Sequence, residues 1–200
     1  FSQTLTMLDA PTRVKISKAD ITNHEEIPGA TLRVLDKDGN VVDEWVSEKT
    51  PHYMEAVLIA GETYTLEETL VPDNSGYVPA NSIQFTVEDG GKVQHVFMQD
   101  DYTKVQISKT DIATGKEISG AKLKITDASG NTIAEWETNG QPHRIERLKP
   151  GEYTLTETAA PAGYLLSEEV HFTVQETGEI QKVTCLLYTS DAADELDGVD

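Results

Sequence analysis

The sequence TRVKISKADI, residues 12–21, returns as TKVQISKTDI at residues 103–112. Three further pairs keep the same spacing: Gly39-Asn40 with Gly130-Asn131, Glu44-Trp45 with Glu135-Trp136, and Pro51-His52 with Pro142-His143. A repeat of this length corresponds to a whole domain rather than to one unit of a solenoid. The sequence therefore predicts two homologous modules: module 1 at residues 10–101 and module 2 at residues 102–184.

Each module shows the alternation of apolar and polar residues that is typical of β-strands. In module 1 the alternation is clear at residues 64–66, 83–87 and 96–98. The sequences DGN at 38–40 and SGN at 129–131 are turns, because Gly and Asn accept a positive φ. No segment has a strong helical pattern. Short strands with turns at this spacing predict an all-β fold of tandem immunoglobulin-like antiparallel β-sandwiches.

Composition excludes several classes of partner. The formal net charge is −19, whereas binding nucleic acid needs clustered Lys and Arg to neutralise phosphates. An anionic membrane surface is excluded for the same reason, and no apolar run is long enough to be inserted across a bilayer. The five histidines are dispersed without metal-ligand spacing. We expect no metal, no cofactor, no nucleic acid partner and no membrane insertion.

The start of the chain extends the repeat. The sequence MLD at residues 7–9 lines up with MQD at residues 98–100, ahead of the second copy. We therefore expect residues 1–9 to be the last strand of a preceding module that is missing, with Asp9 in the position that Asp100 has in module 1.

The end of the chain departs from the repeat. Residues 185–195, CLLYTSDAADE, resemble the translation of a transposon-end sequencing adapter. We expect residues 185–200 to be non-native and native sequence to stop near Thr184, which truncates the last strand of module 2. A natural acidic tail is the alternative. In neither case do we expect Cys185 to be a nucleophile.

Paired motifs in both modules resemble a known family. VKISKAD…GA with ETLVP…GY in module 1, and VQISKTD…GA with ETAAPAGY in module 2, are similar to Cna B-type and SpaA-type pilin domains. These are the prealbumin-like modules of Gram-positive surface adhesins and pili, and the resemblance covers residues 1–184. It implies an extracellular, cell-wall-anchored protein whose signal peptide and anchor lie outside this sequence. The implied partners are neighbouring modules of the chain and a host protein bound through a missing distal domain.

Many modules of that family form a spontaneous isopeptide bond between a lysine on the first strand and an Asp or Asn on the last, assisted by a core Glu. Carried over by motif, the resemblance points to Lys15 as the amine, Asp100 as the acceptor and Glu68 as the catalytic proton shuttle. Strand parity independently places Glu68 and Asp100 on the core-facing side of their strands. Parity puts Lys15 on the other face of its strand from the apolar residues Val14 and Ile16, so the expectation that Lys15 is buried rests on the resemblance. Without a bond, Lys15 is an ion-pair partner of Asp100 or a surface lysine.

Module 2 departs from this pattern. Gln106 stands at the position of Lys15, the acceptor position falls at Leu187, and Glu157 remains as the counterpart of Glu68. A glutamine amide cannot act as the nucleophile, and Lys109 has the opposite strand parity. We therefore expect no bond in module 2.

The leading hypothesis is a structural stalk, in which the modules act as spacers and are not enzymes beyond this autocatalytic bond. The alternative is an adhesin module that binds a host or partner protein directly. Trp45 and Trp136 occupy equal repeat positions, and we interpret them as packing residues rather than as a ligand platform. A hydrolase would need a nucleophile–base pair, and no such motif is present.

Overall fold

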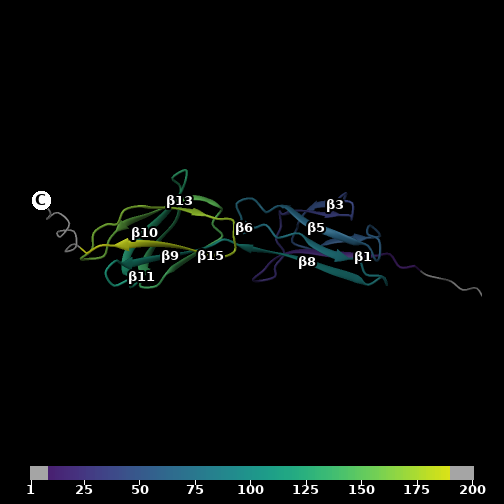
Figure 1. Cartoon of the computed structure of the whole chain (residues 1–200), viewed down its shortest axis with the longest axis horizontal. Coiled ribbons are helices and arrows are strands. Elements are labelled where there is room, and N and C mark those ends of the chain that lie inside the picture. The colour runs from purple at the N-terminus through teal and green to yellow at the C-terminus, as the bar shows by residue number, and fades with distance from the viewer. Residues whose placement is uncertain (1–8, 190–200) are drawn as a thin grey trace, which may run out of the picture. The chain divides into compact units, whose positions relative to one another are not determined.

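The computed structural model describes residues 9–189 and divides the chain into two compact units between Asp101 and Tyr102. Figure 1 shows each unit as a set of strands that pack in layers. The predicted strand at residues 1–9, apart from Asp9, lies outside the described residues, as does the part of the suspected adapter translation after Thr189.

Module 1 consists of two four-stranded sheets. The first has the order β4-β1-β8-β6, from His52–Glu55, Arg13–Asp20, Val93–Tyr102 and Tyr77–Val78. The second has the order β3-β2-β5-β7, from Val41–Val46, Thr31–Leu35, Thr63–Leu70 and Ile83–Thr86. Tyr77 belongs to the two-residue strand β6.

Module 2 repeats this plan. One sheet has the order β12-β9-β15, from His143–Glu146, Lys104–Asp111 and Ile180–Leu187. The other has the order β11-β10-β13-β14, from Thr132–Asn139, Ser119–Asp127, Gly151–Ala159 and Val170–Val174. Strand β15 continues past Thr184, so Cys185 and Leu187 lie in the strand and are buried.

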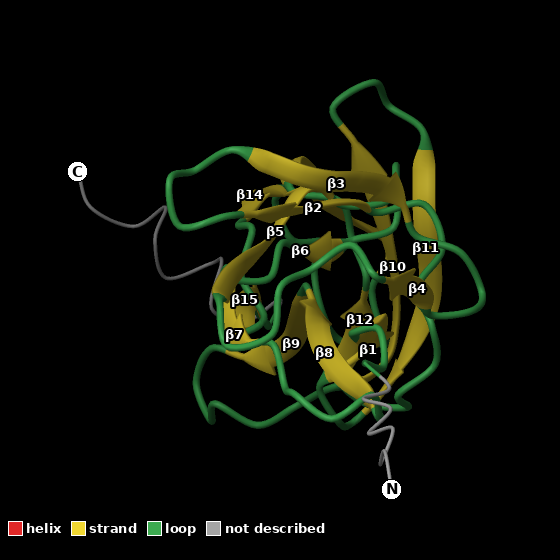
Figure 2. Ribbon diagram, turned by 90° about the vertical axis from the view of Figure 1, so that its right-hand side faces the viewer, coloured by secondary structure: helices red, strands yellow, loops and turns green. Residues whose placement is uncertain are grey.

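The predicted all-β fold of tandem sandwiches is confirmed, and Figure 2 shows strands and loops alone between residues 9 and 189. In that range no helix could span a membrane. Most strand pairs are antiparallel, as predicted. The exception in each module is the pair formed by its first and last strands, which is parallel. In module 1 this pair is β1 with β8, and in module 2 it is β9 with β15. This pairing brings the two ends of each module's sequence side by side.

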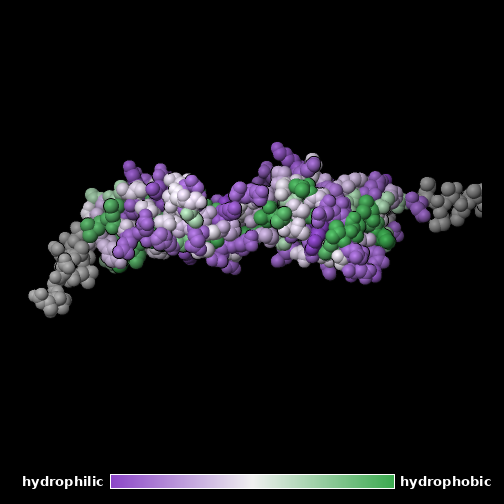
Figure 3. All heavy atoms as spheres, turned by 90° about the horizontal axis from the view of Figure 1, so that it is seen from above, coloured by the Kyte–Doolittle hydropathy of each residue, from purple (hydrophilic) through white to green (hydrophobic). Residues whose placement is uncertain are grey.

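Each module has its own apolar core between its two sheets. In module 1 the core includes Ile16, Leu32, Leu66 and Met98, each at most 2% exposed. Burying such a side chain stabilises the fold by about 1.5–3 kcal/mol. Trp45 packs against this core and stacks on His52 with 4.1 Å between ring centroids, which agrees with a packing role. The surface in view in Figure 3 is mostly hydrophilic, with apolar side chains in separate patches.

Each predicted turn is stabilised by a carboxylate that lies two residues before it. Gly39 and Gly130 have φ of 82° and 84°, values that glycine adopts without strain. In module 1, Asp36 accepts hydrogen bonds from the backbone N–H groups of Asp38 and Asn40, both at 2.9 Å. The hydrogen bond that the side-chain amide of Asn40 donates to Asp36 lowers the pKa of Asp36 most, and the backbone bonds lower it further. The turn therefore holds β2 and β3 in a fixed register.

Candidate functional site

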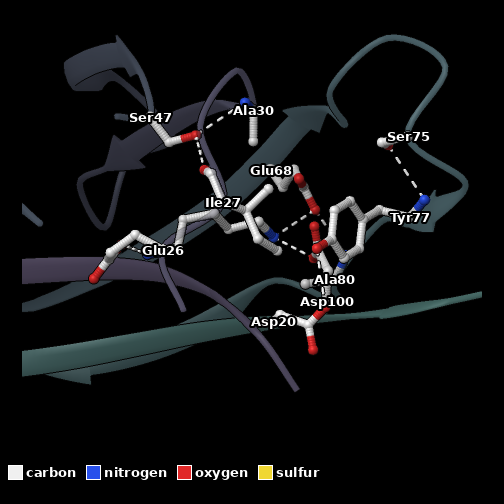
Figure 4. Close-up of polar contacts among 11 residues, drawn as sticks. Asp20, Glu26, Ile27, Ala30, Ser47, Glu68, Ser75, Tyr77, Ala80 and Asp100 are labelled. Atoms are coloured by element: carbon white, nitrogen blue, oxygen red, sulfur yellow. Dashed lines mark hydrogen bonds and ion pairs between the residues drawn. The ribbon is translucent and has the colours of Figure 1, made fainter. Parts of the chain in front are cut away.

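One buried amine in module 1 contacts two buried carboxyl groups. Nζ of Lys18 lies 2.8 Å from Oε2 of Glu68 and contacts Oδ1 of Asp100. The side chains of the three residues are 2%, 0% and 0% exposed. Figure 4 shows the carboxyl groups of Glu68 and Asp100 directed toward one another from their separate strands. The site thus joins β1, β5 and β8.

Strand parity explains why these side chains meet. In β1 the even-numbered residues Val14, Ile16 and Lys18 all face the core. Lys18 is opposite Met98 in the parallel register with β8. Asp100 lies two residues further along the same face, within reach of the long lysine side chain.

The prediction of Lys15 as the amine is wrong. Lys15 is partly exposed and lies opposite Tyr53 of β4 and His95 of β8, on the outer face of the sheet. Its odd position turns the side chain away from the core, because successive side chains of a strand point to opposite faces. The sequence held a usable signal: Lys18 recurs in the repeat as Lys109, whereas Lys15 recurs as Gln106.

Burial changes the protonation of the site. Desolvation raises the pKa of Asp100 from its usual value of 3.8 to about 7, with Lys18 opposing the shift and Glu68 adding to it. Two carboxylates and one ammonium would leave a net negative charge in a dry interior, which is costly. Asp100 therefore keeps its proton up to about pH 7.

Two of the four carboxyl oxygens in this cluster have no hydrogen-bond partner among the described residues. Oε2 of Glu68 accepts a bond from the backbone N–H of Ala80 at 2.8 Å in addition to the lysine contact. Oε1 of Glu68 and Oδ2 of Asp100 are buried and have no hydrogen-bond partner among the described residues. Buried polar atoms without partners cost free energy. The arrangement is therefore poorly satisfied as a simple ion pair.

The tyrosine of the ETLVP…GY motif, Tyr77, supports the end of β1. The hydroxyl of Tyr77 donates to Oδ2 of Asp20 at 2.9 Å. Asp20 also accepts a bond from the backbone N–H of Thr22 at 2.7 Å. These contacts hold the end of β1, two residues beyond Lys18, against the strand β6.

Module 2 has a related but different cluster. Nζ of Lys109 lies 3.2 Å from Oε2 of Glu157, 2.8 Å from Oγ of Ser167 and 3.1 Å from Sγ of Cys185. Leu187 is opposite Asp111 in β9, as Asp100 is opposite Asp20 in β1.

The structure therefore makes Lys109 the counterpart of Lys18. Gln106, which the sequence analysis placed in that role, is partly exposed on the outer face and lies opposite Arg144 and Lys182. The expectation that module 2 forms no bond stays a prediction. Its reason changes, because the missing group is the acceptor and not the amine.

Comparisons with known proteins agree with this architecture. A family model described as a SpaA prealbumin-like fold domain matches residues 12–101 and again residues 103–186. The Bacillus anthracis TIE protein is 26% identical, with a TM-score of 0.52 and coverage of 90% of this chain and 35% of its own. A streptococcal ancillary pilin is 19% identical, with a TM-score of 0.41 and coverage of 89% and 62%. A comparison with curated proteins finds no match.

The shaft pilin SpaA from Lactobacillus rhamnosus GG is also similar, at 11% identity and a TM-score of 0.40, with coverage of 90% of this chain and 98% of the pilin. The chain spans about a third of the length of the TIE protein and 62% of the length of the ancillary pilin.

Proposed function

Because the chain belongs to the family of SpaA prealbumin-like fold domains, we propose that it forms structural stalk modules of a Gram-positive surface protein. In this proposal an isopeptide bond between Lys18 and Asp100 closes module 1. The observation that supports it best is the contact of one buried amine with two buried carboxyl groups, one of which keeps its proton. An extracellular location and cell-wall anchoring are parts of the same proposal.

Bond formation joins Nζ of Lys18 to Cγ of Asp100 and releases one water. Glu68 first takes a proton from the ammonium, which gives a neutral amine that can attack. The protonated Asp100 is the better electrophile, since attack on a carboxylate would place a second negative charge on the same group. Glu68 then transfers protons from the nitrogen to the departing hydroxyl. Of the four protons that start on Lys18 and Asp100, two leave in the water, one stays on the amide and one stays on Glu68.

The protein lowers the barrier mainly through position. The three side chains come from distant strands, with Lys18 and Asp100 separated by 82 positions in the sequence. Folding brings them into contact, so amide formation becomes effectively unimolecular. The unpaired Oδ2 of Asp100 is the oxygen free to leave.

A cross-link between first and last strands suits a spacer that carries load. It closes almost the whole module into one loop, as a disulfide would, and it is insensitive to reductants. The alternative, direct binding of a host protein by these modules, has no particular contact or surface in its favour among the described residues.

Intact-mass spectrometry of the purified chain tests the proposed bond. We expect a mass one water below the calculated value for the unmodified chain, and the full calculated mass for Lys18→Ala. Lys15→Ala is the matched control, because it removes a lysine from the same strand on the opposite face, and it should keep the loss of one water. A wild-type chain of full mass, or water loss that persists in Lys18→Ala, would overturn the assignment.

The rate of bond formation should fall as pH rises above about 7. The reactive state needs the proton on Asp100, and above its pKa of about 7 that proton is lost. We expect a decrease of about tenfold per pH unit. Chain recovered from inclusion bodies and kept in denaturant, which has not folded and so still has its full mass, can be diluted into buffers between about pH 6 and pH 9 and followed by mass. Trp fluorescence in parallel separates refolding from bond formation, and a rate that climbs steadily with pH contradicts the role of Asp100.

A further inference from the structure

One turn of module 2 holds a side-chain amide against the backbone of a glycine. Asn139 ends β11 and precedes Gly140, and it is the one asparagine in the sequence that a glycine follows. Asn139 is exposed. Gly140 has a φ of 82°, and a Cβ built on it would have no heavy atom within 4 Å, so the turn is open to solvent. The counterparts in module 1 are Glu48 and Lys49, so this feature belongs to module 2 alone.

The side chain of Asn139 bends back over this glycine. Its Oδ1 accepts a hydrogen bond from the backbone N–H of Gln141 at 3.1 Å, which closes an Asx-turn. In such a turn the carboxamide carbon lies beside the backbone nitrogen of the intervening residue, here Gly140. Within residues 9–189, neither that nitrogen nor Nδ2 of Asn139 donates a hydrogen bond. The attacking nitrogen and the leaving nitrogen of an intramolecular reaction are therefore both unrestrained.

We propose that the fold primes Asn139 for deamidation. The backbone nitrogen of Gly140 gives up its proton to a solvent base and attacks Cγ of Asn139. The Cγ–Nδ2 bond breaks, Nδ2 takes a proton from water and leaves as ammonia, and a five-membered succinimide remains. Water then opens either carbonyl of the ring, which gives aspartate or isoaspartate. One water is consumed, one ammonia is released, and the module gains one negative charge.

The turn assists this reaction in two ways. It keeps Cγ and the backbone nitrogen close together, so ring closure does not first have to restrict a freely rotating side chain. The N–H of Gln141 also donates to Oδ1, the oxygen on which negative charge develops during the attack. Glycine adds to both effects, because it places no side chain in the path of the nucleophile.

Asn23 provides an internal comparison in module 1. It forms the same kind of turn, in which its Oδ1 accepts a bond from the backbone N–H of Glu25 at 2.9 Å. The residue that follows, however, is His24, whose backbone N–H donates to the carbonyl of Asp20 at 2.9 Å. The nucleophile is thus engaged and carries a side chain, and we expect Asn23 to stay intact.

The product should weaken one end of a sheet. Asn139 is opposite Ser119 in the pair of β10 with β11. Isoaspartate routes the backbone through the side chain and so inserts one methylene, which shifts the register at this end. Ageing should therefore lower the unfolding temperature of module 2 and leave that of module 1 unchanged. This effect does not depend on a cross-link in module 1.

The test is peptide mapping of the whole folded chain after prolonged incubation at mildly alkaline pH. Trypsin releases residues 125–144, which contain both Asn139 and Asn131, and Asn131 precedes Thr132 and donates through Nδ2 to Asp127 at 3.0 Å. We expect deamidation at Asn139 to be at least about tenfold faster than at Asn131 or Asn23. Fragmentation should find isoaspartate at position 139, and the rate should rise with pH because the nucleophile must lose its proton.

Two controls isolate the contribution of the turn. A synthetic peptide of residues 125–144 in the same buffer has the same sequence without the sheet, and the folded chain should deamidate at least as fast as this peptide. Gly140→Ala places a methyl group beside the nucleophile and should slow the reaction by about tenfold, with circular dichroism to verify the fold.

Three results would overturn the proposal. The first is an Asn139 that is more stable in the folded chain than in the peptide. The second is a rate at Asn139 no higher than at Asn131. The third is an unchanged rate in Gly140→Ala, which would exclude the succinimide route.

Discussion

Replacing Lys18 by Met is expected to lower the unfolding temperature of module 1 by about 40 °C. The variant leaves Glu68 and Asp100 facing each other without a cation, and breaking a buried pair costs about 3–5 kcal/mol. It also removes the cross-link, which for a closed loop of this length contributes about 4–5 kcal/mol by restricting the unfolded chain. Each kcal/mol corresponds to about 4–8 °C in a domain of this size. Differential scanning calorimetry measures the change.

Lys109→Met in module 2 is the matched control. It removes the equivalent buried lysine from a site with no carboxyl at the acceptor position, so only the ion-pair contribution is lost. We expect a smaller decrease, about 20 °C, in the transition of module 2. Equal decreases in the two modules would mean that module 1 holds an ion pair and no bond.

The second large effect is mechanical. When the chain is stretched from its ends in a single-molecule experiment, unfolding of cross-linked module 1 should not release the residues between Lys18 and Asp100. Those residues span 82 positions, which correspond to roughly 270–300 Å of extended chain. Lys18→Met should therefore add roughly that length to the extension at which the chain is fully stretched.

Module 2 provides the internal reference for this measurement. Since its acceptor position is Leu187, its full length should be released in both the wild-type chain and the Lys18→Met variant. Two full-length unfolding steps in the wild-type chain would contradict a cross-link in module 1.

The repeat was sufficient to predict the fold and its division into modules. The alternation in residues 64–66 and 96–98 also predicted that Glu68 and Asp100 face the core, because parity is set locally by the strand. Both predictions depend on periodicity over a few residues, which the sequence records directly.

The identity of the amine was harder to predict. A motif match selected Lys15, whereas parity with Val14 and Ile16 favours Lys18, and the structure agrees with parity. The end of β1 also loses its alternation, since every residue from Ile16 to Asp20 is buried. Neighbours distant in sequence cause this, as in the 2.7 Å contact between Ser17 Oγ and His95 Nε2. Burial by residues that are distant in the sequence cannot be read from the local alternation of apolar and polar residues.

The parallel pairing of β1 with β8 has a consequence for how tension acts within a module. Force enters at the start of β1 and leaves at the end of β8, and these points lie at opposite ends of the paired strands. The hydrogen bonds between the strands are then loaded in shear, all at once, and cannot peel apart one after another. Module 2 has the same geometry between β9 and β15, so a brittle, high-force rupture is expected even of a module that carries no covalent bond.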